Sequence, residues 1–171
     1  MKKLFFALSL LCFLQIASLT GQGQARRTFR IENNELKLPT PIVFETGSDR
    51  LKPESYEVLA IVKEYLQEKT YISLLRIEGH MDDNGAAVKN QQLSEKRALA
   101  IARWLIEQGI ACQRLLAVGF GSTKPLAAND SPENRAKNRR MAFINVALRG
   151  RTIGGLPEDG GGKVAGKLCP K

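Results

Sequence analysis

Residues 79–98 read GHMDDNGAAVKNQQLSEKRA, and this stretch decides how the chain is interpreted. A turn that carries Asp82 joins an apolar strand pattern to an apolar helix pattern. Arg97 falls one helical turn before Ile101, at the edge of the apolar face, and its side chain leans back toward the Asp82 turn. An acid and an arginine at one place can hold a zwitterion, because the acid accepts from an ammonium and the arginine donates to a carboxylate. The same spacing also fits an Asp82–Arg97 salt bridge that binds nothing.

The patterns on both sides of this stretch predict alternating strands and helices. Apolar residues recur at helical spacing after Pro53, a residue suited to the first helical position, and Gly109 is a natural stop for the second helix. The predicted elements are a hairpin over 29–38, strands over 42–44, 71–79, 115–118 and 141–148, helices over 53–69 and 87–108, and a helical turn after Ser131-Pro132. This order predicts an α/β (α+β) sandwich, βαβαβ(α)β, with one mixed sheet and helices packed on a face.

The first 25 residues have the pattern of a secretory signal peptide. Lys2 and Lys3 form a basic start, residues 4–16 an apolar run, and residues 17–25 a small and polar stretch that permits cleavage after Ala25. The apolar run is short for a membrane span, and an uncleaved anchor is the alternative. No later apolar run is long enough to cross a membrane as a helix, so we expect no integral span after cleavage.

We divide the chain into a signal peptide (1–25), an N-terminal hairpin or linker (26–38), one domain (39–149) and a Gly-rich tail (150–171). The composition of the tail is typical of a disordered segment. Loss of Lys2 and Lys3 lowers the formal net charge from +9 to +7. That charge suits an anionic partner, or it is only a solvated basic surface. Export argues against nucleic acid as the partner.

Three cysteines bear on the compartment. Cys12 follows Leu11, whereas a lipoprotein signal needs a small residue there, so we interpret Cys12 as part of the signal's apolar core. Cys112 and Cys169 lie in the exported part, where disulfides can form. We predict that they pair, and two unpaired thiols are the alternative. No Cys/His spacing resembles a zinc site, and we expect neither a metal nor a cofactor.

The motifs in this sequence resemble those of a known family. The chain resembles the OmpA-like (OmpA/MotB C-terminal) peptidoglycan-binding domain over roughly residues 35 to 148. The signature is Gly79-His80-x-Asp82-x-x-Gly85-x4-Asn90-x-x-Leu93-Ser94-x-x-Arg97-Ala98. Further matches in register are Ile42-x-Phe44-Glu45, Gly47-Ser48, Leu51, Gly109-Ile110, Arg114-Leu115, Gly119-Phe120-Gly121, Pro125 and Asn138-Arg139-Arg140.

The resemblance implies the same sandwich fold and noncovalent capture of the diaminopimelate in the peptidoglycan stem peptide. By the resemblance, Asp82 receives the diaminopimelate ammonium and Arg97 holds its carboxylate. The remaining positions that it assigns to the pocket are Asn90, Leu93, Phe44, Glu45 and Arg140. It also implies a periplasmic, outer-membrane-associated protein that links the cell envelope to the wall.

The sequence departs from the family pattern at two places. Met81 stands where the family usually has Thr, and Met cannot donate a hydrogen bond to a ligand. Met141-Ala142 stands where Val-Glu usually follows the final Arg pair. Neither departure touches Asp82 or Arg97, so both bear on affinity rather than on the kind of ligand.

Two other functions compete with wall binding. An enzyme would use Glu78, His80, Asp82 and Asp83 as a metal or acid/base cluster, but His80 is the only histidine and a structural role at the end of a strand is the simpler interpretation. We therefore predict no enzymatic activity. The second is a periplasmic adaptor that binds another envelope protein through its basic surface or its tail.

Overall fold

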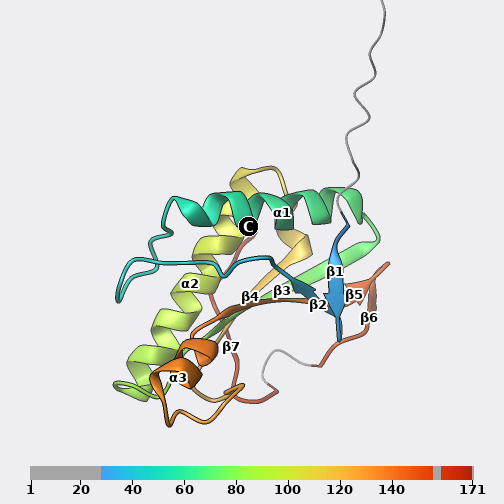
Figure 1. The fold of residues 1–171 in the computed structure, drawn as a ribbon. Helices are drawn as coiled ribbons and strands as arrows, with labels where there is room; N and C mark the ends of the chain where they lie inside the picture. The colour runs from blue at the N-terminus through green and yellow to red at the C-terminus, as the bar shows by residue number, and fades with distance from the viewer. Residues whose placement is uncertain (1–27, 156–158, 171) are drawn as a thin grey trace, which may run out of the picture.

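The computed structural model describes residues 28–155 and 159–170, so the predicted signal peptide lies outside the described residues. The helices are α1 (Glu54–Glu68), α2 (Ala87–Glu107), α3 (Pro132–Asn138) and the 3-10 turn η1 (Cys112–Arg114). The strands are β1 (Arg30–Glu32), β2 (Glu35–Lys37), β3 (Ile72–His80), β4 (Leu115–Gly121), β5 (Met141–Leu148), β6 (Arg151–Thr152) and β7 (Lys163–Val164). These elements form one mixed α/β domain, as the sequence predicts (Figure 1).

The sheet is mixed, with strand order β1-β2-β5-β3-β4-β7 and with β6 paired to β5. The central strand β3 runs parallel to β4 and antiparallel to β5. Its C-terminal end therefore lies beside the end of β4 and the start of β5. This arrangement brings together the residues that follow β3, the residues that follow β4 and the residues just before β5. Among the described residues, no helix has both the length and the hydropathy needed to cross a membrane.

The core lies between one face of the sheet and the helices α1 and α2. Alternate side chains of a strand point to opposite faces, so Leu75 and Ile77 of β3 face the helices. They pack with fully buried residues of both helices, among them Leu59, Val62, Ile101 and Leu105. Gly119 lets α2 approach β4 closely, because a Cβ at that position would lie 2.5 Å from the backbone nitrogen of Glu95. This close packing fixes the position of the N-terminal half of α2.

Two predicted strands differ in extent from the observed ones. Residues 42–44 do not form a strand, and only Phe44 makes an isolated bridge, to Leu51. The Ser55 hydroxyl instead fastens this segment to the start of α1, because it accepts from Val43 N and donates to Val43 O, both at 2.8 Å. In the other case β4 continues to Gly121, beyond the predicted end at 118.

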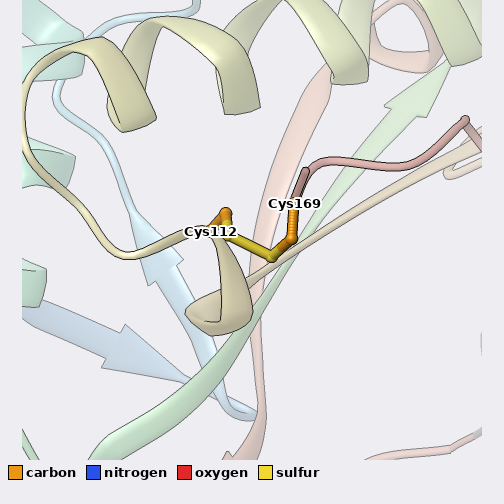
Figure 2. The surroundings of a disulfide bond; sticks show 2 residues. All are labelled: Cys112 and Cys169. Carbon is orange, nitrogen blue, oxygen red and sulfur yellow. A yellow bond between two sulfur atoms is a disulfide. The ribbon is translucent and has the colours of Figure 1, made fainter. Parts of the chain in front are cut away.

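The C-terminal segment departs from the disordered tail that its composition predicts. Residues 163–164 form β7, which pairs antiparallel with β4, and Ala165 is buried in the core. Cys112 and Cys169 are joined by the predicted disulfide, which ties the segment to η1 (Figure 2). Gly160 and Gly161 have φ of +84° and +86°, a backbone conformation that favours glycine. These glycines therefore serve a turn rather than flexibility.

The same segment crosses the face of the sheet opposite the helices. Ile153 N donates to Val146 O of β5 at 2.8 Å, and Gly155 O accepts from Arg76 Nη1 of β3 at 2.9 Å. Further along, Gly160 O accepts from the Thr123 hydroxyl, just beyond β4, at 2.7 Å. The described residues of the segment thus contact β5, β3 and the residues just beyond β4.

Candidate functional site

A cavity of about 450 Å³ opens where the turn after β3 meets α2 and the segment before α1. Five of the seven predicted ligand residues line it, namely Phe44, Glu45, Asn90, Leu93 and Arg97. The remaining lining residues are Ile42, Val43, Thr46, Gly47, Met81 and Arg139. The cavity therefore brings together residues from four parts of the chain, namely 42–47, Met81, α2 and Arg139, and two of its side chains are guanidinium groups.

Arg97 is half-buried in the wall of this cavity and is held by neutral groups. Its Nε donates to Ser48 O at 2.9 Å, and its Nη1 lies 3.6 Å from the sulfur of Met81. Its guanidinium lies over the Phe44 ring, 4.8 Å from the centroid. Burial lowers the Arg97 pKa, Asp49 raises it and Arg139 lowers it. Arginine nevertheless stays protonated in proteins, so this side chain presents a cation.

No carboxylate within the described part of the chain lies close enough to Arg97 to form a salt bridge. This is unusual for a half-buried arginine, because a charge withdrawn from water is normally compensated by an opposite charge or by full hydrogen bonding. Met81, the first of the two departures from the family pattern noted above, lies in the cavity wall beside Arg97. The sulfur of Met81 faces the guanidinium, where it accepts rather than donates.

Asp82 is paired with a residue that the sequence analysis did not assign to the site. Its side chain is buried, and Oδ2 accepts from Arg139 Nη1 at 2.6 Å while Oδ1 accepts from Asn84 N at 3.2 Å. The alternative of an Asp82–Arg97 salt bridge is therefore replaced by an Asp82–Arg139 pair. Arg139 remains 44% exposed at its side chain, so the pair has one buried and one solvated partner.

Asn90 holds the turn that carries Asp82. Its side-chain Nδ2 donates to Asp82 O at 3.1 Å and to Asn84 O at 2.8 Å. Gly85 completes the turn with φ of +89°. Asn90 thus joins α2 to the backbone on both sides of Asp83, and it sets the position of the Asp82 carboxylate relative to Arg97.

Arg140 lies beside the main cavity rather than in its wall. Its Nη1 donates to Asn138 O at 3.4 Å and its Nη2 to Lys124 O at 3.3 Å. It lines a much smaller neighbouring cavity of about 20 Å³, which Arg97 and Arg139 also reach. Consecutive residues at the start of a strand point in opposite directions, so one member of the Arg139-Arg140 pair faces the main cavity and the other does not. The pair itself was the available signal, but it could not tell which member faces inward.

Glu78 and His80 lie on the opposite side of the sheet from the core and are buried, with Arg76, under the C-terminal segment. Glu78 accepts from Arg76 Nε at 2.7 Å and contacts His80 Nε2 at 3.0 Å, and the His80 ring stacks on Phe120 at 5.1 Å. The hydrogen-bond partner of His80 is thus a carboxylate. These side chains do not share a cavity with Asp82, so the acid/base cluster of the enzyme alternative is not assembled.

Burial and charge set the pKa values in this buried group. Burial raises the pKa of Glu78, but the hydrogen bond from His80 and the charge of Arg76 outweigh it, so the pKa is lowered. Burial lowers the pKa of His80, only partly offset by Glu78. Glu78 is therefore ionised and His80 neutral near pH 7, with Nδ1 of His80 unpaired among the described residues.

Comparison with known proteins identifies the family of the chain. Residues 43–139 match the model described as the OmpA family. The "Outer-membrane lipoprotein YfiB" of Pseudomonas aeruginosa is 35% identical over 130 residues, which cover 76% of this chain and 75% of YfiB. The "Peptidoglycan-binding protein ArfA" of Mycobacterium tuberculosis is 36% identical over 104 residues, which cover 61% of this chain and 32% of ArfA. The chain therefore matches about a third of the length of ArfA.

Solved structures give the same result. A MotB-like protein from Desulfovibrio vulgaris is 32% identical with a TM-score of 0.58, over 64% of this chain and 70% of that protein. The peptidoglycan-associated lipoprotein from Burkholderia pseudomallei is 27% identical with a TM-score of 0.54, over 63% of this chain and 89% of that protein. Both are similar in fold and in sequence to the domain described above.

Proposed function

The chain belongs to the OmpA family, and we propose that it binds peptidoglycan noncovalently through the diaminopimelate of the stem peptide. The family consists of binding and structural proteins rather than enzymes. ArfA is named as a peptidoglycan-binding protein, and the Burkholderia relative is named as peptidoglycan-associated. These names support the polymer as ligand. The choice of diaminopimelate within the polymer depends on the charges in the cavity.

The observation that carries the proposal is Arg97. This guanidinium is half-buried, fixed by Ser48 O and Phe44, and without a carboxylate at salt-bridge distance in the part of the chain that the structure describes. A ligand carboxylate would supply the missing charge. Because the guanidinium is already held in place, little side-chain freedom is lost when the ligand binds. The side-chain carboxylate of diaminopimelate fits this requirement, whereas an uncharged wall component does not.

Asp82 would receive the ammonium of the same ligand by exchange of one cation for another. In the free protein its Oδ2 accepts from Arg139, whose side chain is 44% exposed. An arriving ammonium could replace Arg139 at the Asp82 carboxylate, because the Arg139 side chain already has access to solvent that can rehydrate it. Glu45 is an acid in the cavity wall, and its carboxylate pairs with Arg50 at 3.4 Å.

Placement in the cell envelope follows from the same reasoning. Relatives include an outer-membrane lipoprotein and a peptidoglycan-associated lipoprotein. We propose a periplasmic protein, exported by cleavage after Ala25 and associated with the outer membrane through the wall. The adaptor alternative loses its free tail, because residues 159–170 are part of the domain.

Pull-down with purified sacculi tests the site. Arg97→Ala and Asp82→Ala should each weaken binding about 30- to several-thousand-fold, because removal of one partner of a desolvated charge pair costs about 2–5 kcal/mol. Sacculi with lysine in place of diaminopimelate should bind poorly, since they lack the carboxylate that Arg97 would hold. Lys63→Ala on α1 is the control and should bind like wild type. The salt concentration is kept near physiological to suppress general basic attraction.

The proposal is wrong if both site variants, shown to be folded, sediment with sacculi as well as wild type does. If the site variants lose binding to the lysine-type and the diaminopimelate-type sacculi equally, peptidoglycan stays the proposed ligand but the specificity for diaminopimelate is wrong.

A further inference from the structure

A half-buried stripe on α2 leads away from the cavity. Leu93, Arg97, Ala100 and Trp104 follow one another at spacings of four, three and four residues, so they lie on one side of the helix, and all four are partly exposed. The first two line the cavity. The stripe then continues over the partly exposed Ala100 to Trp104.

An aromatic pair stands at the end of this stripe. The rings of Trp104 and of Tyr56 on α1 lie with centroids 5.9 Å apart and planes inclined by 36°. Tyr56 is 42% exposed, so much of this apolar ring faces solvent. Its neighbour Ser55 is the residue that fastens α1 to Val43 in the cavity wall. Both rings therefore belong to elements that also build the cavity.

We propose that Tyr56 and Trp104 form a saccharide subsite, which packs against one sugar ring of the glycan strand whose stem peptide occupies the cavity. This inference rests on the proposed function and adds a second component of the same polymer to the ligand. The distance supports it. Trp104 lies seven positions after Arg97 in the helix, or about 10.5 Å along the axis. Diaminopimelate is the third residue of the stem counted from the sugar, and three extended residues span about 10–11 Å.

The chemistry of the pair suits a sugar ring. One face of a pyranose presents C–H groups, which pack on an aromatic ring, while its hydroxyl and amide groups need hydrogen-bond partners. Trp and Tyr combine a large apolar ring with an N–H or O–H at its edge, so they can serve both parts of the sugar. A purely structural pair would seal the contact between α1 and α2, but that role does not require Tyr56 to remain exposed.

The test compares two soluble ligands, the disaccharide–tetrapeptide of diaminopimelate-type peptidoglycan and the same tetrapeptide without sugar. We expect the disaccharide form to bind wild type about 3- to 10-fold more tightly, the scale of one aromatic packing contact. Tyr56→Ala should abolish this difference without changing the affinity for the sugar-free peptide. Tyr56→Phe, which keeps the ring, should retain it.

Fluorescence gives an independent readout, because Trp104 is the only tryptophan in the chain. Its emission should change with the disaccharide form and not with the sugar-free peptide. Tyr71→Ala is the matched control, since Tyr71 is 45% exposed but lies just before the opposite end of β3 from the cavity.

The outcomes separate the two proposals. Equal binding of both ligands, with Tyr56→Ala and the Trp104 emission unaffected, overturns the saccharide subsite and leaves the proposed function intact. Failure of wild type to bind either ligand, with the domain folded, overturns both. A sugar-dependent gain that survives Tyr56→Ala places the sugar elsewhere and also overturns the subsite.

Discussion

Arg76 and Arg97 are both withdrawn from water, but their surroundings differ in one respect. Arg76 is 6% exposed, and its guanidinium contacts Glu78 Oε1 through Nε at 2.7 Å and through Nη2 at 2.6 Å. Arg97 is half-buried and meets a carbonyl, a sulfur and an aromatic ring. The chain thus compensates one arginine internally and leaves the other available for an external anion. Full compensation points to a structural role, and its absence at a cavity points to binding.

The difference follows from what covers each face of the sheet. The C-terminal segment contacts the face that carries Arg76, and Gly155 O accepts a hydrogen bond from that guanidinium. A charge under such a cover needs a partner, because burial of an uncompensated charge costs several kcal/mol. The cavity at Arg97 stays open to solvent, so water can satisfy the guanidinium until a ligand replaces it.

The largest effect is expected where the compensated arginine loses its partner. Glu78→Ala should lower the free energy of unfolding by about 3–5 kcal/mol, because it leaves the buried charge of Arg76 without this carboxylate. Urea denaturation measures the change, and Glu107→Ala, an exposed acid at the end of α2, is the control. Sacculus binding per folded molecule should stay at the wild-type level. A loss below about 1 kcal/mol would mean that Arg76 is compensated by other groups and that the two arginines differ less than proposed.

The next largest loss of stability is expected when the C-terminal segment is released from η1. The disulfide closes a loop with a sequence separation of 57 residues. Replacing Cys112 and Cys169 together by Ser should lower the free energy of unfolding by about 2–4 kcal/mol. Dithiothreitol should do the same to wild type and nothing to the double variant. Equal stability of oxidised and reduced wild type would mean that β7 and Ala165 hold the segment without the bond.

Acid should lower the free energy of unfolding in two stages, through His80 and Glu78 beside Arg76. Each stage should be smaller than the loss caused by Glu78→Ala. The pKa of His80 is lowered from its ordinary 6.5, so the folded state favours the neutral ring, and stability falls as the pH drops below about 6.5 and the unfolded chain takes up a proton. The pKa of Glu78 is lowered from 4.5, so its contribution is complete above 4.5 and is lost as the pH falls through its folded value.

Urea unfolding from pH 8 down to about pH 2 measures both stages, because the second one lies below pH 4.5. His80→Gln should remove the first stage and keep the second, because Gln can still donate to Glu78 but does not titrate. A first stage that persists in His80→Gln would assign it to another group.

The elements that the sequence predicts correctly differ in physical character from those that it does not predict. The predicted helices agree with α1 and α2 to within about two residues, because their apolar spacing is local and strong. The pairing of Asp82 with Arg139 spans 57 positions and leaves no periodic signal, so it could not be found in this way. The composition of residues 150–171 predicts a disordered tail, because Gly160 and Gly161 resemble linker residues. Their positive φ values instead serve the turn before β7. Composition does not distinguish these two uses of glycine.

The smallest effect on binding is expected from the loss of Arg139 in the cavity wall. Arg139 pairs with Asp82 and is 44% exposed at its side chain. Arg139→Ala should change sacculus binding by no more than about fivefold, the equivalent of about 1 kcal/mol, because two effects oppose each other. The ammonium of the ligand would no longer have to displace Arg139 from Asp82, while some attraction for the ligand carboxylate would be lost. Arg97→Ala measured beside it should fall at least about 30-fold. Should Arg139→Ala lose as much binding as Arg97→Ala, Arg139 would be a ligand contact of equal weight, and Arg97 would no longer be the one cation that the fold leaves for the wall.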